Sequence, residues 1–458
     1  MATPATARSL FARTSGHQLF MVALAVVCAL VVGASIGKEL WPVVAALVAL
    51  PVVIWWPVQC ALGAFAVLVL FEPTALADSG GGKAIGFFVG AAATGILLAT
   101  AVIGRRLQTP PRAAMWWTLA VVWAGLTGFW ALDPQIVIGR VPTAFALLIL
   151  YLAAVSLRVE EREFRPVVAL IILAGLLAGA YSCYQYSQGL GHHVFGPLRG
   201  SLVIAGSVVN PDLFATRLML PLALTVSTFF IATSWLKKTL MLGVGGVMLL
   251  AILLTQSRAA LLGLIIMTAV FLFRLGVNPR ILAVCGAFAM VVMFLPSQLF
   301  TRVSEAAGTG GAGRVSIWQV GLELVKHYGI FGAGLSNFPA AYANYAGYAT
   351  VFKGFDNGAH NLYLQITVEC GVVGLLLLLQ SVRTQMSAGR KSRRDAGKPN
   401  IWLVAGEAAS LALLIACFFA DLMWEKVFWL TWIMLGLATQ LYNTRLQNMK
   451  QGKRPQAV

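Results

Sequence analysis

One histidine and three arginines stand beside long apolar runs in this sequence, where ionisable side chains are energetically expensive. His360 directly precedes an apolar run, and Arg258 separates two such runs. Arg199 and Arg314 lie in the polar segments before and after that pair of runs. A histidine can accept a proton near neutral pH, and a guanidinium group can bind phosphate oxygens through two parallel hydrogen bonds. These residue types suit a reaction in which a hydroxyl loses its proton and a diphosphate departs.

The four residues can act together only if the elements around them bring them to one side of a membrane. The chain is 59% hydrophobic and 11% charged, with a mean hydropathy of +0.83, which excludes a soluble globule. Its apolar runs are continuous rather than alternating, so we predict an all-α, polytopic integral membrane protein with about 12, and up to about 14, transmembrane helices. The runs lie near residues 18–37, 40–56, 58–72, 84–104, 115–132, 141–157, 166–185, 212–234, 239–256, 259–273, 281–296, 361–382, 401–420 and 426–444.

Basic residues gather in the connections that fall on one side of this predicted topology. Counted from a cytoplasmic N-terminus, that side receives 22 of the 33 Lys and Arg residues, which leaves 11 for the other side and the spans. Because basic connections mark the cytoplasmic side, we expect both termini in the cytoplasm. The net charge of +17 then indicates topology rather than nucleic-acid binding. The outer face receives the segments 186–211, 255–258, 297–360 and 421–426.

The predicted organisation is one membrane domain over residues 1–458, with transmembrane helices within 18–296 and 361–444. Residues 297–360 form one large outer loop, and a polar segment of this length is uncommon unless it is functional. Apolar residues recur at helical spacing over residues 315–328, which predicts an amphipathic helix at the outer interface. Further along, four aromatic residues share a helical stripe that suits packing more than stacking on sugars. They are Phe338, Tyr342, Tyr345 and Tyr348.

Each residue with chemical potential also has a purely structural interpretation. Arg258 stands at the tip of a predicted hairpin, where an arginine can extend its side chain to the membrane surface. A lone histidine before a helix, such as His360, is usually structural, and Asn361 beside it suits a helix cap. The sequence pattern alone leaves these alternatives open.

Five short motifs occur in a fixed order over about residues 200–380. They are Asn210-Pro211-Asp212, Ser257-Arg258-Ala259-Ala260-Leu261-Leu262-Gly263, Gly313-Arg314 with Trp318, Gly332-Ala333-Gly334 with Asn337-Phe338, and His360-Asn361-Leu362-Tyr363-Leu364. In order and spacing they resemble the superfamily of O-antigen ligases and O-antigen polymerases, and in particular the ligases that join O-antigen to the lipopolysaccharide core. The spans before residue 200 resemble that superfamily only in hydropathy.

The resemblance implies a membrane-embedded, GT-C-like glycosyltransferase of lipopolysaccharide biosynthesis in the bacterial inner membrane, with its active site at the periplasmic face. Its donor would be a glycan linked to undecaprenyl diphosphate, and its acceptor the lipid A–core oligosaccharide. The resemblance makes His360 the catalytic base and Arg258, Arg314 and Arg199 the residues that bind diphosphate. Asn361 and Asn210 would support them.

No cofactor and no metal are expected for this reaction. A metal that handles diphosphate needs clustered carboxylates, and the predicted outer face carries only scattered acidic residues without a D-x-D motif. We therefore expect metal-independent transfer with inversion at the anomeric carbon. The expected partners are the two lipid-linked substrates and membrane lipid, without nucleic acid.

Three alternatives stay open at this point. An O-antigen polymerase shares the motifs and joins repeat units to one another. A protein O-oligosaccharyltransferase of the same superfamily commonly carries a further C-terminal extension. A transporter would explain the many spans, but the two halves of the sequence show no evident repeat and few ionisable residues lie within the spans.

Overall fold

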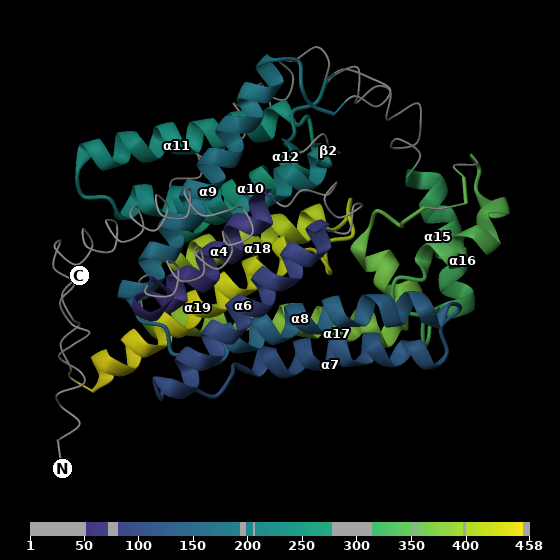
Figure 1. Ribbon diagram of the computed structural model, residues 1–458, viewed down its shortest axis with the longest axis horizontal. Helices are drawn as coiled ribbons and strands as arrows, with labels where there is room; N and C mark the ends of the chain where they lie inside the picture. Colours follow the sequence, from purple (N-terminus) through teal and green to yellow (C-terminus); the bar gives the residue numbers. More distant parts are fainter. Residues whose placement is uncertain are drawn as a thin grey trace, which may run out of the picture.

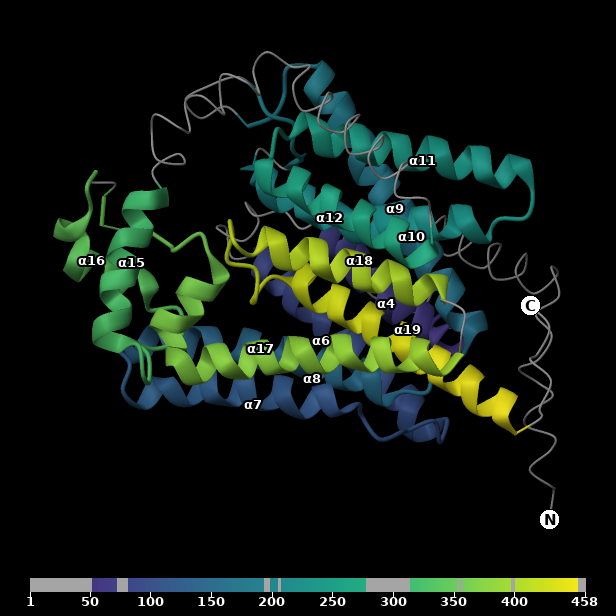
Figure 2. The ribbon, with the colours of Figure 1, turned by 180° about the vertical axis from the view of Figure 1, so that it is seen from behind.

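The computed structural model describes residues 52–71, 81–192, 198–204, 207–276, 314–351, 354–355, 357–396 and 400–451. These residues form a bundle of long helices with a smaller helical unit at one end (Figures 1 and 2). Seven of the described helices are long and apolar enough to cross a membrane. They are α6 (Gly81–Ile103), α8 (Pro134–Ser156), α9 (Glu161–Ser187), α10 (Pro211–Ile231), α11 (Trp235–Leu254), α12 (Arg258–Leu275) and α17 (Leu362–Ala396).

Four further described helices pack into the same bundle. Two of them, α4 (Pro57–Phe71) and α18 (Ile401–Ala416), are apolar but shorter. The others are α7 (Arg112–Leu126) and α19 (Lys426–Lys450). A short antiparallel hairpin of β1 (Val203–Ile204) and β2 (Ser207–Val208) precedes α10, with Val203 opposite Val208.

These helices confirm the prediction of an all-α membrane protein. The predicted spans near 18–37 and 281–296, and most of the span near 40–56, lie outside the described residues. The total of about 12 to 14 spans therefore stays a prediction, as does the single domain over residues 1–458.

The structure corrects two predicted helix boundaries. α8 begins at Pro134 rather than near residue 141, because Asp133 caps it by accepting a backbone hydrogen bond at 2.8 Å. The first turns of α8 contain polar residues, so a search for apolar runs does not include them. α17 continues to Ala396, past the predicted end near residue 382, because the first proline after its start is Pro399.

The bundle is held together by an aromatic core between α7, α8 and α19. Trp117 of α7 packs against Tyr151 of α8 and against Trp429 and Trp432 of α19, and all four side chains are completely buried. The ring centroids of Trp117 lie 5.5 Å from those of both Trp429 and Trp432. Beyond this core, α17 packs on α7 and α12 packs on α18. These contacts fix the helices whose ends carry the candidate site.

At one end of the bundle a helical unit forms its own small core (Figure 1). It consists of α15 (Arg314–Tyr328), α16 (Phe338–Tyr345) and the short helix η3 (Ala346–Tyr348). The helix predicted over residues 315–328 is confirmed as α15, with its predicted apolar stripe facing this core. Of the predicted aromatic stripe, Phe338 and Tyr342 are completely buried, so these two residues pack rather than stack on a ligand.

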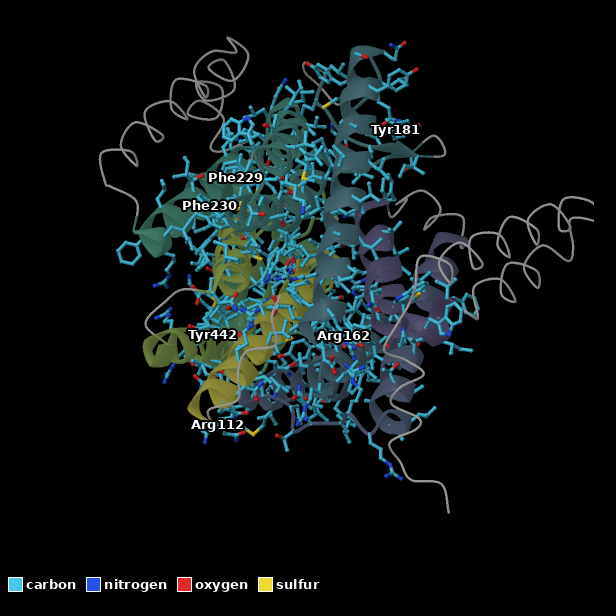
Figure 3. The ribbon with its side chains drawn as sticks, turned by 90° about the vertical axis from the view of Figure 1, so that its left-hand side faces the viewer. Arg112, Arg162, Tyr181, Phe229, Phe230 and Tyr442 are labelled. Carbon is cyan, nitrogen blue, oxygen red and sulfur yellow. The ribbon has the colours of Figure 1, made fainter. Side chains whose placement is uncertain are left out.

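The connections that the sequence assigns to one side of the membrane meet at this end of the bundle, which we call the outer end. The described parts of 186–211, 255–258, 297–360 and 421–426 all lie there (Figures 1 and 2). Arg112 and Arg162, predicted on the cytoplasmic side, lie at the opposite end (Figure 3). Which end faces the periplasm stays a prediction.

The loop after α15 lies directly against a break in α17. At Gly371 the backbone of α17 leaves helical geometry, with a φ of 70°, and a Cβ atom there would lie 2.1 Å from the Ile330 carbonyl oxygen. At Gly332, with a φ of 90°, a Cβ atom would lie 2.2 Å from the Glu369 carbonyl oxygen. Only glycine fits both positions, so these two glycines allow the outer unit to dock on the bundle.

Candidate functional site

The candidate site is built around Asp212, in the first turn of α10 at the outer end. Asn210 caps this helix, because its side-chain oxygen accepts hydrogen bonds from the backbone N–H groups of Asp212 and Leu213, at 2.8 and 3.3 Å. Pro211 occupies the first helical position, where its missing N–H is not needed. The cap therefore holds Asp212 at the helix start, where it can contact side chains from other elements.

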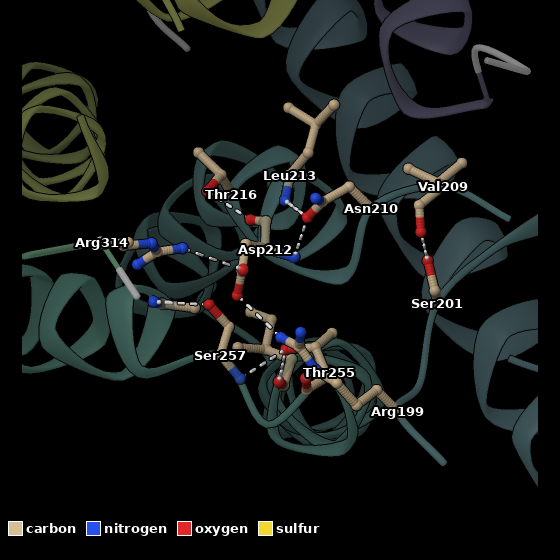
Figure 4. A network of polar contacts seen from close by, with 12 residues as sticks. Arg199, Ser201, Val209, Asn210, Asp212, Leu213, Thr216, Thr255, Ser257 and Arg314 are labelled. Carbon is tan, nitrogen blue, oxygen red and sulfur yellow. Dashed lines mark hydrogen bonds and ion pairs between the residues drawn. The ribbon is translucent and has the colours of Figure 1, made fainter. Parts of the chain in front are cut away.

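Arg199 forms an ion pair with Asp212 (Figure 4). Its Nη2 atom lies 2.9 Å from Oδ1 of Asp212, and its Nε donates a hydrogen bond to the Thr255 carbonyl oxygen at 2.8 Å. Both charged side chains are largely buried, with 14% and 22% of their surfaces exposed. Arg199 thus connects the loop before α10 to α10 and to the turn between α11 and α12.

A three-residue turn joins α11 to α12 and brings Arg258 to the outer end. Gln256 adopts a left-handed φ of 52°, and Ser257 caps α12 by accepting a hydrogen bond from the backbone N–H of Ala260 at 3.3 Å. Arg258 follows as the first residue of α12. Within the described ranges no carboxylate forms an ion pair with Arg258, whereas Arg199 and Arg314 both contact Asp212. Its guanidinium is therefore free to bind an anionic group, which the positive end of the helix dipole also favours.

Arg314, the first residue of α15, approaches Asp212 from the outer unit. Its Nη2 atom lies 3.8 Å from Oδ2 of Asp212, and its guanidinium lies 5.9 Å from the centre of the Phe419 ring. Burial lowers the pKa of the Arg314 guanidinium, and the Asp212 carboxylate opposes that shift. The positive charges of Arg258 and Arg199 lower the pKa further, although an arginine stays protonated at neutral pH. The three guanidinium groups therefore act on one another electrostatically.

This cluster holds more positive charge than its own carboxylate can balance. The cluster contains three guanidinium groups and one described carboxylate, which leaves two positive charges over. A diphosphate that is esterified at both ends carries one negative charge on each phosphoryl group and would balance them. Guanidinium forks also match the geometry of phosphate oxygens.

His360 stands directly before α17, in a left-handed backbone conformation with a φ of 47°. Trp318 of α15 holds the preceding residue, because its Nε1 donates a hydrogen bond to the Ala359 carbonyl oxygen at 3.0 Å. Asn361 on the other side caps α17 by accepting a hydrogen bond from the backbone N–H of Leu364 at 3.1 Å. The His360 side chain itself is exposed, and no other described side chain hydrogen-bonds its imidazole. Two neighbours thus fix the backbone while the ring stays accessible.

The surroundings of His360 favour its neutral form. Removal of water by the neighbouring protein lowers the pKa of His360, and the positive charge of Arg314 lowers it further. The Asp212 carboxylate acts in the opposite direction. The net effect is a pKa below 6.5, so the imidazole is neutral at pH 7. A neutral, accessible imidazole can take a proton from a hydroxyl group.

The arrangement suits charge stabilisation by arginine more than metal binding. Among the described residues, no three His, Cys, Asp or Glu side chains are grouped so that they could hold a metal ion. The carboxylate at the centre, Asp212, is already occupied by two guanidinium groups. Guanidinium groups that are fixed in advance can stabilise charge that develops on a departing phosphate.

The structure gathers all four residues that the sequence singled out for chemistry. Arg199 and Arg314 contact Asp212 directly, and the charge of Arg258 acts on Arg314. The charges of Arg314 and Asp212 in turn act on His360. The two supporting residues, Asn210 and Asn361, are helix caps. The predicted catalytic role of His360 and the predicted binding roles of the three arginines stay predictions.

Sequence reasoning missed the residue at the centre of the cluster. Asp212 was visible only as part of the motif Asn210-Pro211-Asp212 and was not among the predicted site residues. One signal could have identified it, because an acidic residue in the first turn of a predicted span usually has a charged partner. The contact between Arg314 and Phe419, which lie far apart in the sequence, had no comparable signal.

Comparison with known proteins gives one family match. A search of curated proteins found no match to the chain. Residues 243–379 match the family model described as O-antigen ligase. The matched segment contains Arg258, Arg314 and His360, and it extends from α11 into α17. Over this segment, the chain is similar to the O-antigen ligase family.

Proposed function

We propose that this protein transfers O-antigen glycan from undecaprenyl diphosphate to the lipid A–core oligosaccharide, at the periplasmic face of the bacterial inner membrane. The supporting observation is the convergence of Arg199, Arg258, Arg314 and His360 around Asp212 at the outer end. In this proposal the enzyme is a GT-C-like glycosyltransferase whose termini are both cytoplasmic. It acts in lipopolysaccharide biosynthesis.

In the proposed reaction His360 removes the proton from an acceptor sugar hydroxyl. The hydroxyl oxygen attacks the anomeric carbon of the donor, and the bond between that carbon and the diphosphate oxygen breaks. The diphosphate leaves with the bonding electron pair, and the proton stays on the imidazole until it passes to the leaving group or to water. Attack from the side opposite the leaving group inverts the anomeric carbon.

The arginines have different parts in this proposal. Arg258 binds the diphosphate directly, because it has no described carboxylate partner. Arg314 contacts the same diphosphate while Asp212 holds its guanidinium in place. Arg199 is mainly an anchor, since its guanidinium is already bonded to Asp212 and to the Thr255 carbonyl. One pre-positioned hydrogen-bond donor typically contributes about 10²- to 10³-fold to the rate of such a step.

The proposed transfer needs neither a metal nor a cofactor. The two positive charges that the cluster leaves over take the place that a divalent cation has in metal-dependent diphosphate chemistry. Transfer should therefore continue in excess chelator. Loss of transfer in chelator, with recovery on addition of magnesium, is the result that the proposal forbids.

Substitution in a reconstituted assay tests the proposed roles. His360→Ala and Arg258→Ala should each leave the protein folded and inserted. Transfer should be lost in His360→Ala and lowered about 10²- to 10³-fold in Arg258→Ala. Arg162→Ala is the matched control, because Arg162 lies at the opposite end with 70% of its side chain exposed. Wild-type transfer by either site variant would remove that residue from the mechanism.

The choice of acceptor separates ligase from polymerase and from protein glycosylation. With lipid A–core as the sole acceptor, a ligase forms product, whereas a polymerase needs a second lipid-linked repeat unit. A protein O-oligosaccharyltransferase would require a polypeptide acceptor. Flux of donor across liposomes without formation of a new glycosidic bond would indicate a transporter instead.

A further inference from the structure

A second polar cluster joins the outer unit to the bundle, two to three helical turns from His360. Its centre is Glu369 of α17, whose side chain is completely buried. Oε1 of Glu369 accepts a hydrogen bond from the backbone N–H of Phe338, at the start of α16, at 3.3 Å. The backbone carbonyl of Glu369 accepts another from Gly334 at 2.9 Å. Glu369 therefore holds the loop before α16 with both its side chain and its backbone.

Gln365 links this carboxyl group to a second one. Its Nε2 donates hydrogen bonds to Oε1 of Glu369 at 3.0 Å and to Oδ2 of Asp421 at 2.7 Å. The two carboxyl oxygens are therefore no farther apart than the sum of these lengths, 5.7 Å. Asp421 lies in the turn between α18 and α19, so the link spans three separate parts of the outer end.

The hydrogen-bond balance of this cluster favours a proton on one of the two carboxyl groups. Among the described residues, buried polar atoms without a partner include Oε2 of Glu369, Oε1 of Gln365 and Oδ1 of Asp421. All three atoms are acceptors, and leaving several acceptors buried and unpaired is costly. A proton on Oε2 of Glu369 turns one of them into a donor. It also removes the repulsion between two nearby carboxylates.

Of the two acids, Glu369 is the better place for the proton. No part of its side chain reaches solvent, whereas Asp421 is only half-buried. Burial raises the pKa of Asp421 to about 6, with the Arg140 guanidinium opposing and the Glu425 carboxylate adding to the shift. Asp421 is therefore ionised at neutral pH. The other titratable groups that face this pair are the thiols of Cys370 and Cys417.

We propose that Glu369 carries a proton at neutral pH and that the bridge Glu369–Gln365–Asp421, with a single negative charge on Asp421, is a positioning element for His360. The bridge fixes the loop before α16, through Phe338, and the first turns of α17 in one arrangement. His360 precedes these turns directly, and a displacement of about 1 Å at a reacting group can lower the rate about 10²-fold. The positioning role rests on the proposed function, whereas the proton on Glu369 does not.

Infrared difference spectroscopy of the full-length protein at neutral pH tests whether Glu369 carries a proton. The wild type should show the C=O stretch of a protonated carboxylic acid, and Glu369→Gln should remove it while Asp421→Asn retains it. Glu323→Gln is the matched control, because Glu323 is ion-paired with Lys326 on α15 and is ionised. A band that persists in Glu369→Gln would overturn the assignment.

Glycan transfer tests the positioning role. Glu369→Gln imitates the protonated side chain and should keep transfer within about twofold of the wild type. Glu369→Ala should lower kcat about 10- to 100-fold with little change in KM, because it displaces His360 rather than the bound substrates. Equal rates of transfer by Glu369→Ala and the wild type would overturn this role. An equal loss of transfer in folded Glu369→Ala and folded Glu369→Gln would also overturn it. If the wild type transfers no glycan at all, the proposed function is wrong. The infrared result would still show whether Glu369 carries a proton.

Discussion

The guanidinium of Arg199 lies 2.9 Å from the carboxylate of Asp212, and this ion pair forms the base of the cluster on which the other site residues depend. Arg314 shares the carboxylate from the opposite side, at 3.8 Å. Asp212 therefore separates two like charges that would otherwise repel each other within a largely buried site. Its two oxygens thus hold guanidinium groups from two different parts of the outer end.

Asp212→Asn should weaken both the site and the fold. The variant keeps the shape of the side chain but leaves two arginines without their counterion, which should cost about 1 to 3 kcal/mol of stability. Thermal unfolding in detergent measures this loss, and donor KM should rise at the same time. Thr118→Ser, in α7 away from the site, serves as the control. An unchanged melting temperature together with an unchanged KM would contradict the central place of Asp212.

Replacement of Arg258 should distinguish charge from geometry. Arg258→Ala should lower kcat about 10²- to 10³-fold, because the diphosphate loses its directly bonded donor. Arg258→Lys keeps the charge but loses the planar fork, so its rate should lie between the rate of the alanine variant and that of the wild type. Steady-state kinetics with a defined donor decide the order. A lysine variant as fast as the wild type would mean that charge alone suffices.

The pH dependence of transfer should follow the neutral form of His360. Because the pKa of His360 is lowered, kcat should be constant near pH 7 and fall only as the pH drops through a value below 6.5. Two substitutions should move this pKa in opposite directions. Arg314→Gln removes a positive charge and should raise it, whereas Asp212→Asn removes a negative charge and should lower it. NMR titration of the His360 imidazole measures both shifts, and shifts of the same sign would refute this arrangement.

The close approach of the outer unit to α17 should make two glycines irreplaceable. Gly371→Ala places a Cβ atom against the Ile330 carbonyl at a left-handed φ, and such strain costs about 1 to 3 kcal/mol before any clash is counted. Gly332→Ala should behave in the same way. Gly243→Ala is the control, because nothing lies within 4 Å of its Cβ position in α11 and alanine favours a helix by about 0.5 to 1 kcal/mol. Equal melting temperatures for the three variants would contradict this docking.

Features encoded locally could be predicted from the sequence. The turn between α11 and α12 follows from two apolar runs separated by Ser257 and Arg258, and α15 follows from an apolar stripe that ends before Gly329. The gathering of the arginines with His360 at one end followed from counting predicted spans, and the total number of spans stays a prediction. Hydropathy was sufficient for these features because each depends on neighbouring residues.

Features that depend on contacts between distant segments could not be predicted. Asp212 became the centre of the site only when Arg199 and Arg314 were seen on either side of its carboxylate. The bridge from Glu369 through Gln365 to Asp421 joins two residues of α17 to a turn up to 56 positions away in the sequence, and no spacing pattern predicts it. The start of α8 was missed for a different reason, because its polar first turns do not resemble a membrane span.

The most direct test of the proposed function uses purified protein, a defined undecaprenyl-diphosphate glycan and rough lipopolysaccharide in excess chelator. Mass analysis should find one product in which the whole glycan is joined to the lipid A–core, and NMR of that product should show an inverted anomeric centre. The His360→Ala variant should form none of it. Absence of the joined product with the wild-type protein, or its formation only after magnesium is added, would contradict the proposed function.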